Sequence, residues 1–182
     1  MRVFKLKTPL KEEDVIDLRA GDRVYLSGKI YTARDMAHRR FMEVIEKGED
    51  LPFDIKDQVI FYVGPAPAKP GYVIGPCGPT TSYRMDKYTP ILHKLGLRGT
   101  IGKGMRGKEV KEALRKYKGI YFVATGGVAA LLCKKVKSSR IIAYEDLGTE
   151  AVRELEVEDL PLFVGIDTRG NDIYEKALKR EG

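Results

Sequence analysis

The sequence predicts an α/β fold in which a mixed sheet is flanked by helices, formed by a single domain over residues 1–182. Its length and its 43% hydrophobic content suit one buried core. Strand-like segments come first, and strand-like and helix-like segments alternate after them. That order indicates a mixed sheet, whose early strand-rich part we expect to form a second layer. The glycine- and proline-rich stretches are short and join core-like strands, so we interpret them as loops within one domain.

The first 48 residues predict several strands and two helices. Residues 2–7 alternate polar and apolar side chains, which is the period of a half-exposed strand. A short helix is predicted to open at Thr8-Pro9, because acidic residues occupy the early turns that follow. A longer amphipathic helix is predicted over 32–48, with Thr32 as its N-cap and Gly48 at its end. Two further strand segments are predicted at 23–27 and 29–32.

Residues 75–86 form the stretch around which we expect the chain to be organised. The apolar run 72–74 leads into it and is interpreted as a buried strand. Two glycines and two prolines then break the backbone, and the hydroxyls of 80–82 can cap a following helix that kinks or restarts at Pro90. Because free N–H groups at a helix N-terminus favour anions, the stretch predicts a site for a carboxylate or phosphate. The alternative is a capped helix whose Arg84 is only solvated.

The rest of the chain alternates between the two periodicities. A glycine pair at 126–127 follows a predicted strand, but it lacks the full dinucleotide-binding fingerprint, so it favours close strand–helix packing over phosphate binding. Strands are predicted at 58–63, 97–101, 119–125, 139–144 and 158–167, and helical segments at 108–117, 128–136, 145–154 and 171–180.

Three loops each follow a predicted strand and carry a cation beside hydroxyls or glycines. Ligands of α/β sheets gather beyond the carboxyl ends of the strands, so converging loops would form one site. Two arginines can each grip a carboxylate through two hydrogen bonds and a lysine adds a point charge, which suits a small molecule with two carboxylates. The alternative is three unrelated, solvated surface cations. The cations are Arg34 near Thr32, Arg84 near Thr80 and Thr81, and Lys103 between Gly102 and Gly104.

Charge and cysteine content narrow the class of protein. The 33 basic and 26 acidic residues give a formal charge of +7 without a dense basic block, so we favour an anion-binding site over nucleic acid as the partner. Cys77 and Cys133 are too few for a disulfide framework or an iron–sulfur cluster, and we predict no metal site in this chain. Cys133 is interpreted as a packed side chain, and so is Cys77, for which a reactive thiol beside the turn is the alternative. No signal peptide or membrane span is visible, and the expected location is the cytoplasm.

The most specific signal is a set of separated motifs in a fixed order. They are Ser27-Gly28, Thr32-Ala33-Arg34-Asp35-Met36-Ala37-His38, Gly78-Pro79-Thr80-Thr81-Ser82-Tyr83-Arg84-Met85-Asp86, Gly102-Lys103-Gly104, Gly126-Gly127-Val128-Ala129-Ala130 and Glu156-Val157-Glu158-Asp159-Leu160-Pro161. From about Leu10 to Asp167 the chain resembles the β subunit, or C-terminal domain, of the class I iron–sulfur hydro-lyases, the family of fumarate hydratase and L-tartrate dehydratase.

The resemblance implies a fold and a division of labour. The fold would be a swivelling β/β/α domain. The [4Fe–4S] cluster would be bound by a separate α subunit and not by this chain, and the two subunits would assemble as α2β2 and share an active site. The substrate would be a small dicarboxylate, most simply the (S)-malate and fumarate pair, with tartrate or a mesaconate-type acid as alternatives.

The resemblance also implies roles for single residues. The cations would stabilise the negative charge that builds on a substrate carboxylate when a proton leaves the neighbouring carbon. A helix-face histidine is otherwise most simply structural, with proton transfer as the alternative. The implied substrate-binding residues are Arg34, Thr80, Thr81, Arg84 and Lys103, with Thr80 also in proton transfer, and the implied supporting residues are Asp35 and His38.

A hypothesis of another class is a non-catalytic module that binds anions or nucleic acid. It predicts a basic face and salt-sensitive binding to DNA or RNA. The ordered motifs favour the enzyme.

Overall fold

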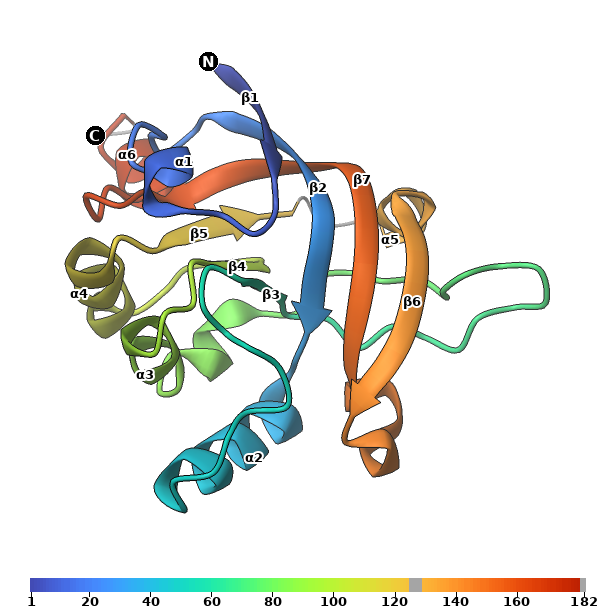
Figure 1. The fold of residues 1–182 in the computed structure, drawn as a ribbon. Helices are drawn as coiled ribbons and strands as arrows, with labels where there is room; N and C mark the ends of the chain where they lie inside the picture. Colours follow the sequence, from blue (N-terminus) through green and yellow to red (C-terminus); the bar gives the residue numbers. More distant parts are fainter. Residues whose placement is uncertain (125–128, 181–182) are drawn as a thin grey trace.

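A computed structural model describes residues 1–124 and 129–180 and consists of a seven-stranded mixed sheet with helices around it (Figure 1). The α/β class with a mixed sheet is therefore confirmed. The strands are β1 (Val3–Lys7), β2 (Arg23–Thr32), β3 (Val59–Phe61), β4 (Gly99–Gly102), β5 (Ile120–Val123), β6 (Val136–Ala143) and β7 (Val152–Ile166). The helices are α1 (Glu12–Val15), α2 (Asp35–Glu46), α3 (Thr89–Lys94), α4 (Lys108–Tyr117), α5 (Ala129–Lys134) and α6 (Ile173–Leu178), with 3₁₀ turns η1 (Ser82–Met85) and η2 (Glu145–Glu150).

The sheet closes on itself through its longest strand. Its order is β1-β2-β3-β4-β5-β7-β6, and β7 pairs with β2 as well as with β5. Strands β2, β3, β4 and β5 run parallel, whereas β7 runs antiparallel to each of its neighbours. Strands β2, β3, β4, β5 and β7 therefore form a closed, barrel-like ring, from which β1 and β6 extend.

Strands β3 and β5 have hydrophobic side chains at every position because both of their faces are covered. In β3, Val59 and Phe61 point into the core inside the ring, while Ile60 belongs to a second core beneath α2. The same alternation places Phe122 of β5 inside the ring and Tyr121 against α4. This two-sided burial explains why these strands are continuous apolar runs and do not alternate with polar residues.

The predicted buried strand at 72–74 is wrong. Tyr72 and Val73 are 68% and 52% exposed and lie in a long loop between β3 and η1 that projects away from the sheet (Figure 1). Both edges of β3 are already paired, with β2 and β4, so the ring has no free edge for another strand there. Prolines before and after the run also remove backbone donors that a strand would need.

The predicted N-cap of the first long helix is also wrong. The helix α2 begins at Asp35 with Arg34 as its N-cap, and Thr32 is the last residue of β2. The Thr32 hydroxyl instead accepts a hydrogen bond from the Arg153 backbone N–H at 3.0 Å, because β7 runs alongside at this point. The helical segment predicted at 145–154 is shorter than predicted. It consists of the 3₁₀ turn η2, because the chain enters β7 at Val152. The glycine pair at 126–127 lies outside the described residues.

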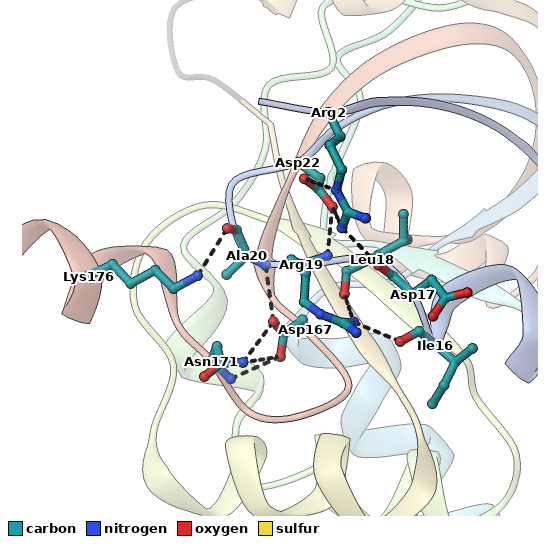
Figure 2. Close-up of polar contacts among 10 residues, drawn as sticks. All are labelled: Arg2, Ile16, Asp17, Leu18, Arg19, Ala20, Asp22, Asp167, Asn171 and Lys176. Atoms are coloured by element: carbon teal, nitrogen blue, oxygen red, sulfur yellow. Dashed lines mark hydrogen bonds and ion pairs between the residues drawn. The ribbon is translucent and has the colours of Figure 1, made fainter.

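A buried carboxylate fastens the chain at the opposite end of β2. Asp167 follows β7 and accepts hydrogen bonds from Ala20 and Asn171 (Figure 2), whose backbone N–H groups lie at 3.1 and 3.0 Å. It also accepts from the Arg169 backbone N–H at 3.0 Å. Beside it, Asp22 pairs with Arg2 at 2.6 Å. Burial alone would raise the pKa of Asp22, but the hydrogen bonds that its carboxylate accepts lower it. These contacts hold α1 and α6 near one end of β2, while α2 lies at the other (Figure 1).

None of the described helices is long and apolar enough to cross a membrane. The cytoplasmic location stays a prediction.

Candidate functional site

The predicted site residues follow three neighbouring parallel strands. Arg34 comes two residues after β2, and Lys103 directly follows β4. Thr80 is held at the end of β3 between them, because its backbone N–H donates to the Tyr62 carbonyl at 2.7 Å. Since β2, β3 and β4 are parallel, their carboxyl ends lie on the same edge of the sheet. The three loops therefore start from one edge of the sheet, although the strand before the Thr80 segment is β3 and not the predicted run at 72–74.

Asp35 joins the two arginines. Its carboxylate lies 3.2 Å from Arg84 Nε and accepts a hydrogen bond from Arg84 Nη2 at 3.3 Å. The same carboxylate lies 3.9 Å from Arg34 Nε. Because these residues come from α2 and η1, this contact fixes the arginines near each other even though 49 positions separate Asp35 from Arg84. The side chains of Arg34 and Arg84 are 29% and 40% exposed, so solvent and ligands can reach both.

The Arg34 side chain lies over a glycine. A Cβ at Gly64 would lie 3.0 Å from Arg34 Nη1 and 3.1 Å from its Cδ, so a side chain here would displace the guanidinium. Glu150 of η2 lies 4.0 Å from Arg34 Nε, which is too long for a hydrogen bond. That Nε is buried and makes no hydrogen bond with the described residues, so the Arg34 guanidinium is not saturated by them.

The segment around Thr80 and Thr81 is tied to Lys103 by the backbone. Thr81 and Lys103 form a parallel bridge, in which the Ser82 N–H donates to the Lys103 carbonyl at 3.0 Å. Gly102 permits this approach, since a Cβ there would lie 1.9 Å from Ser82 Oγ. The Lys103 side chain is exposed and makes no ion pair within the described part of the chain. The backbone of Thr81 and that of Lys103, whose ammonium is unpaired within the described residues, therefore lie side by side.

His38 supports Arg34 from inside the protein. Its ring is fully buried, and Nδ1 lies 2.7 Å from the Arg34 carbonyl oxygen, which also accepts from the His38 backbone N–H. A carbonyl can only accept, so Nδ1 carries the hydrogen and Nε2 is the unprotonated nitrogen. Burial lowers the pKa of His38 to about 4. A neutral imidazole packed on Tyr88 suits an orienting role and not proton transfer with a ligand.

Beneath the site lies a buried guanidinium that the sequence analysis did not single out. The Arg106 side chain has no exposed surface, and its Nε donates to Asp86 Oδ1 at 2.6 Å. Its other nitrogens donate to Thr89 Oγ1 at 2.7 Å and to Tyr62 and Thr100 at 3.2 Å each. Coulombic attraction by its neighbours keeps the pKa of Arg106 raised although burial opposes charge. Arg106 is therefore charged and has a well-bonded guanidinium.

The cluster is open and nearly neutral as it stands. Arg34 lies within 4.0 Å of the carboxylates of Asp35 and Glu150, and Arg84 pairs with Asp35. With Lys103, the three cations exceed these two carboxylates by one positive charge. Three hollows of the described surface, of about 610, 490 and 250 Å³, are lined by other residues. An exposed group of cations of this kind contacts a bound anion on one side only, so a second protein surface is needed to enclose the anion.

The family profile described as Fumarase C-terminus matches residues 1–177. The chain belongs to the Fumarase C-terminus family. Within it, the chain is 41% identical over 177 residues to fumarate hydratase 2 of Leishmania major, with 95% of this chain and 31% of the relative covered. It is 42% identical over 177 residues to a Methanocaldococcus jannaschii protein provisionally named L(+)-tartrate dehydratase subunit beta (94% and 91% covered). It is 35% identical over 179 residues to L(+)-tartrate dehydratase subunit beta of Escherichia coli (96% and 88% covered).

These relatives differ in length. The chain spans about a third of the fumarate hydratases that it matches, and most of the two dehydratase subunits. The Fumarase C-terminus module therefore occurs both within longer chains and as a subunit of its own length.

This Fumarase C-terminus chain does not offer ligands for a [4Fe–4S] cluster. Cys77 is buried, and burial raises the pKa of its thiol to about 12, the opposite of what a thiolate ligand needs. Cys133 belongs to α5, and its thiol contacts the Ala130 carbonyl at 3.0 Å. Among the residues that the structure describes, no group of three His, Cys, Asp or Glu could hold a metal ion. A [4Fe–4S] cluster, as the sequence resemblance implied, therefore does not fit the residues in the described part of this chain.

Proposed function

We propose that this chain is the β subunit of an iron–sulfur hydro-lyase, most simply a fumarate hydratase that interconverts (S)-malate and fumarate plus water. It supplies the cationic, dicarboxylate-binding half of an active site that a separate α subunit completes. The observation that carries the proposal is the convergence of Arg34, Arg84 and Lys103 beside Thr80 at the carboxyl ends of β2, β3 and β4. Family membership supports the same reaction class.

Each cation has a task that follows from its chemistry. Arg34 and Arg84 offer planar forks that bind carboxylates through paired hydrogen bonds, and Lys103 adds a mobile point charge. When a proton leaves the carbon beside a carboxylate, negative charge builds on the carboxylate oxygens, and cations already in place stabilise it. Asp35 occupies the arginines until a substrate carboxylate replaces it, and His38 holds the Arg34 backbone.

Thr80 and Thr81 supply hydroxyls beside the cations. Neither hydroxyl makes a hydrogen bond to the described residues, so both remain available to a substrate. Thr80 is proposed to contact the substrate and to take part in proton transfer. Because a threonine hydroxyl is a poor base by itself and no described carboxylate or imidazole bonds to it, the accepting base is assigned to the partner.

Charge balance supports a shared site. A dicarboxylate brings two negative charges, whereas the cluster has one positive charge in excess. The partner must therefore supply the remaining positive charge. It must also bind the iron–sulfur cluster, because the cysteines of this chain do not suit one. The two relatives of similar length are named as beta subunits, which supports an α partner and is compatible with an α2β2 assembly. The swivelling β/β/α fold in a single domain, 1–182, and a cytoplasmic location are part of the same proposal.

The experiment is to purify the chain without oxygen together with its candidate α partner, reconstitute iron and sulfide, and follow fumarate absorbance after adding malate. Turnover in the mixture and in neither subunit alone is the expected result. A cluster-loaded complex that is inert with malate but converts tartrate would keep the site and change the substrate, as the dehydratase relatives suggest. Inertness toward all such acids, with salt-sensitive DNA or RNA binding by the chain, would replace the proposal by the binding-module hypothesis.

A further inference from the structure

The buried Arg106–Asp86 ion pair connects the two segments that carry the site. Asp86 lies two residues after Arg84, at the end of η1, and Arg106 lies three residues after Lys103. Asp86 Oδ1 accepts from Arg106 Nε at 2.6 Å, and Asp86 Oδ2 accepts from the Gly107 backbone N–H at 2.6 Å. Both carboxylate oxygens are thus bound to the loop that follows Lys103.

The same guanidinium reaches further into the scaffold. Arg106 Nη2 donates to Thr89 Oγ1 at 2.7 Å and to the Tyr62 hydroxyl at 3.2 Å, and the Arg106 Cζ atom lies 4.8 Å from the centroid of the Tyr121 ring. The Tyr121 hydroxyl in turn contacts the Gly104 carbonyl at 2.8 Å and Ser82 Oγ at 2.9 Å. The contacts to Tyr62, Ser82 and Thr89 join residues before Lys103 to residues after it, so the network restrains the distance between the two segments.

We propose that Arg106 and Asp86 are positioning residues that set the separation between Arg84 and Lys103. The inference rests on the proposed function, in which these two cations grip a dicarboxylate. Neither residue touches the substrate. Arg106 is fully buried and its charge is balanced by Asp86, so it acts through the loops that it ties together and not as a further binding cation.

A fixed separation matters only for a ligand with two anionic groups. A dicarboxylate gains from both cations at once if their spacing matches its own, and a misplacement of about 1 Å can cost about 100-fold. A monocarboxylate needs only one cation, so its affinity does not depend on the spacing between the two cations. A role in spacing therefore predicts a loss confined to two-point ligands, whereas partial unfolding removes active sites without changing the affinity of those that remain.

The experiment uses the reconstituted α–β complex carrying Asp86→Asn. Succinate and butyrate, which are four-carbon acids with two carboxylates and one, are measured as competitive inhibitors of malate turnover. The matched control is Asp57→Asn, because Asp57 pairs with Arg98 at 2.8 Å at the other end of β4, away from the site. Arg106→Lys is the second variant if Asp86→Asn does not fold, since a lysine keeps the charge but cannot hold Asp86 and Thr89 together.

The expected result is a 10- to 100-fold rise, to order of magnitude, in the succinate inhibition constant and in KM, with the butyrate constant changed by less than about twofold. Asp57→Asn should leave all three constants unchanged. Equal weakening of both inhibitors, or a fall in kcat with unchanged constants, would overturn the positioning role.

The result also separates this inference from the proposed function. If the wild-type complex has no hydro-lyase turnover, calorimetric titration with succinate and butyrate gives the same comparison, and a selective loss of succinate binding supports the positioning role alone. A wild-type complex that binds neither acid overturns both proposals.

Discussion

Replacing Arg84 with alanine should abolish most activity while leaving the fold intact. Within the described chain, the Arg84 side chain bonds to Asp35, at 3.2 and 3.3 Å, and it is 40% exposed. Ion pairs at exposed positions contribute about 0–1 kcal/mol to stability. In a chain of this size 1 kcal/mol corresponds to about 2–4 °C in Tm, so Arg84→Ala should lower Tm by no more than about 4 °C.

The effect on catalysis should be larger by far. Removing one preorganised donor from developing negative charge costs about 10²–10³ in kcat, or about 2.7–4 kcal/mol. The variant also frees Asp35, whose carboxylate lies 3.9 Å from Arg34 and would then repel an incoming carboxylate. The double variant Arg84→Ala/Asp35→Asn should therefore recover part of the substrate affinity that Arg84→Ala loses.

The assay is steady-state malate turnover by the reconstituted complex, with assembly checked by gel filtration and Tm by calorimetry. Arg140→Ala is the control, because Arg140 also pairs with a carboxylate, Glu154 at 3.1 Å, but lies on β6. Its turnover should match wild type. An assembled Arg84→Ala complex with turnover within about threefold of wild type would refute the reasoning, because such a loss is far below that of a donor to the transition state.

Three further outcomes follow from the structure. Gly64→Ala should reduce turnover by roughly threefold to tenfold, because the new Cβ would lie 3.0 Å from Arg34 Nη1 and 3.1 Å from the Thr149 carbonyl and would shift Arg34 by a few tenths of an ångström; wild-type kinetics would contradict this. Burial lowers the pKa of His38 to about 4 and of His93 to about 3, whereas unfolded histidines titrate near pH 6.5, so the unfolded state binds more protons between these values. Stability in urea should therefore fall as pH falls from about 6.5 to 4, by up to about 1.4 kcal/mol per pH unit for each histidine, and a ring that titrates near pH 6.5 by NMR would refute this. Asp167→Asn should cost about 1–3 kcal/mol and several degrees of Tm by placing an amide donor against backbone N–H groups, with kcat unchanged because Asp167 lies at the far end of β2; an unchanged Tm or a changed kcat would count against it.

The sequence identifies the elements that depend on local periodicity. The helix α4 lies at 108–117 as predicted, because Val110 and Leu114 repeat at helical spacing and are buried. The strand β5 follows from its continuous apolar run. The positions of Arg34 and Lys103 were predictable, because both follow strands, β2 and β4, whose carboxyl ends lie on the same edge of the sheet. The position of Arg84 was not predictable in this way, because the strand predicted before it at 72–74 is a loop.

Features that depend on distant partners were not predictable. The run at 72–74 has the composition of a strand, but pairing of β3 on both sides leaves no edge for it. The sequence around Thr32 suits a helix N-cap, but its hydroxyl accepts a hydrogen bond from the Arg153 backbone N–H of β7, 121 residues away. Arg106 is one cation in a glycine-rich loop, and its pairing with Asp86 is visible only once η1 and the β4–α4 loop are side by side.

The signal that could have pointed to Arg106 is the sequence around it. Gly102, Gly104 and Gly107 give the loop the conformational freedom to turn, and Arg106 is a charged side chain in a loop that must pack against a strand end. Glu150 offers no such signal, since its contact with Arg34 depends on the path of η2.

The most direct test of the account is the structure of the assembled α–β complex with succinate bound. The account predicts that the two carboxylates lie within hydrogen-bond distance of Arg34, Arg84 and Lys103, with Thr80 beside the bound acid and Asp35 displaced from Arg84. A complex in which the partner alone holds both carboxylates, and these side chains remain paired as they are in the isolated chain, would contradict it.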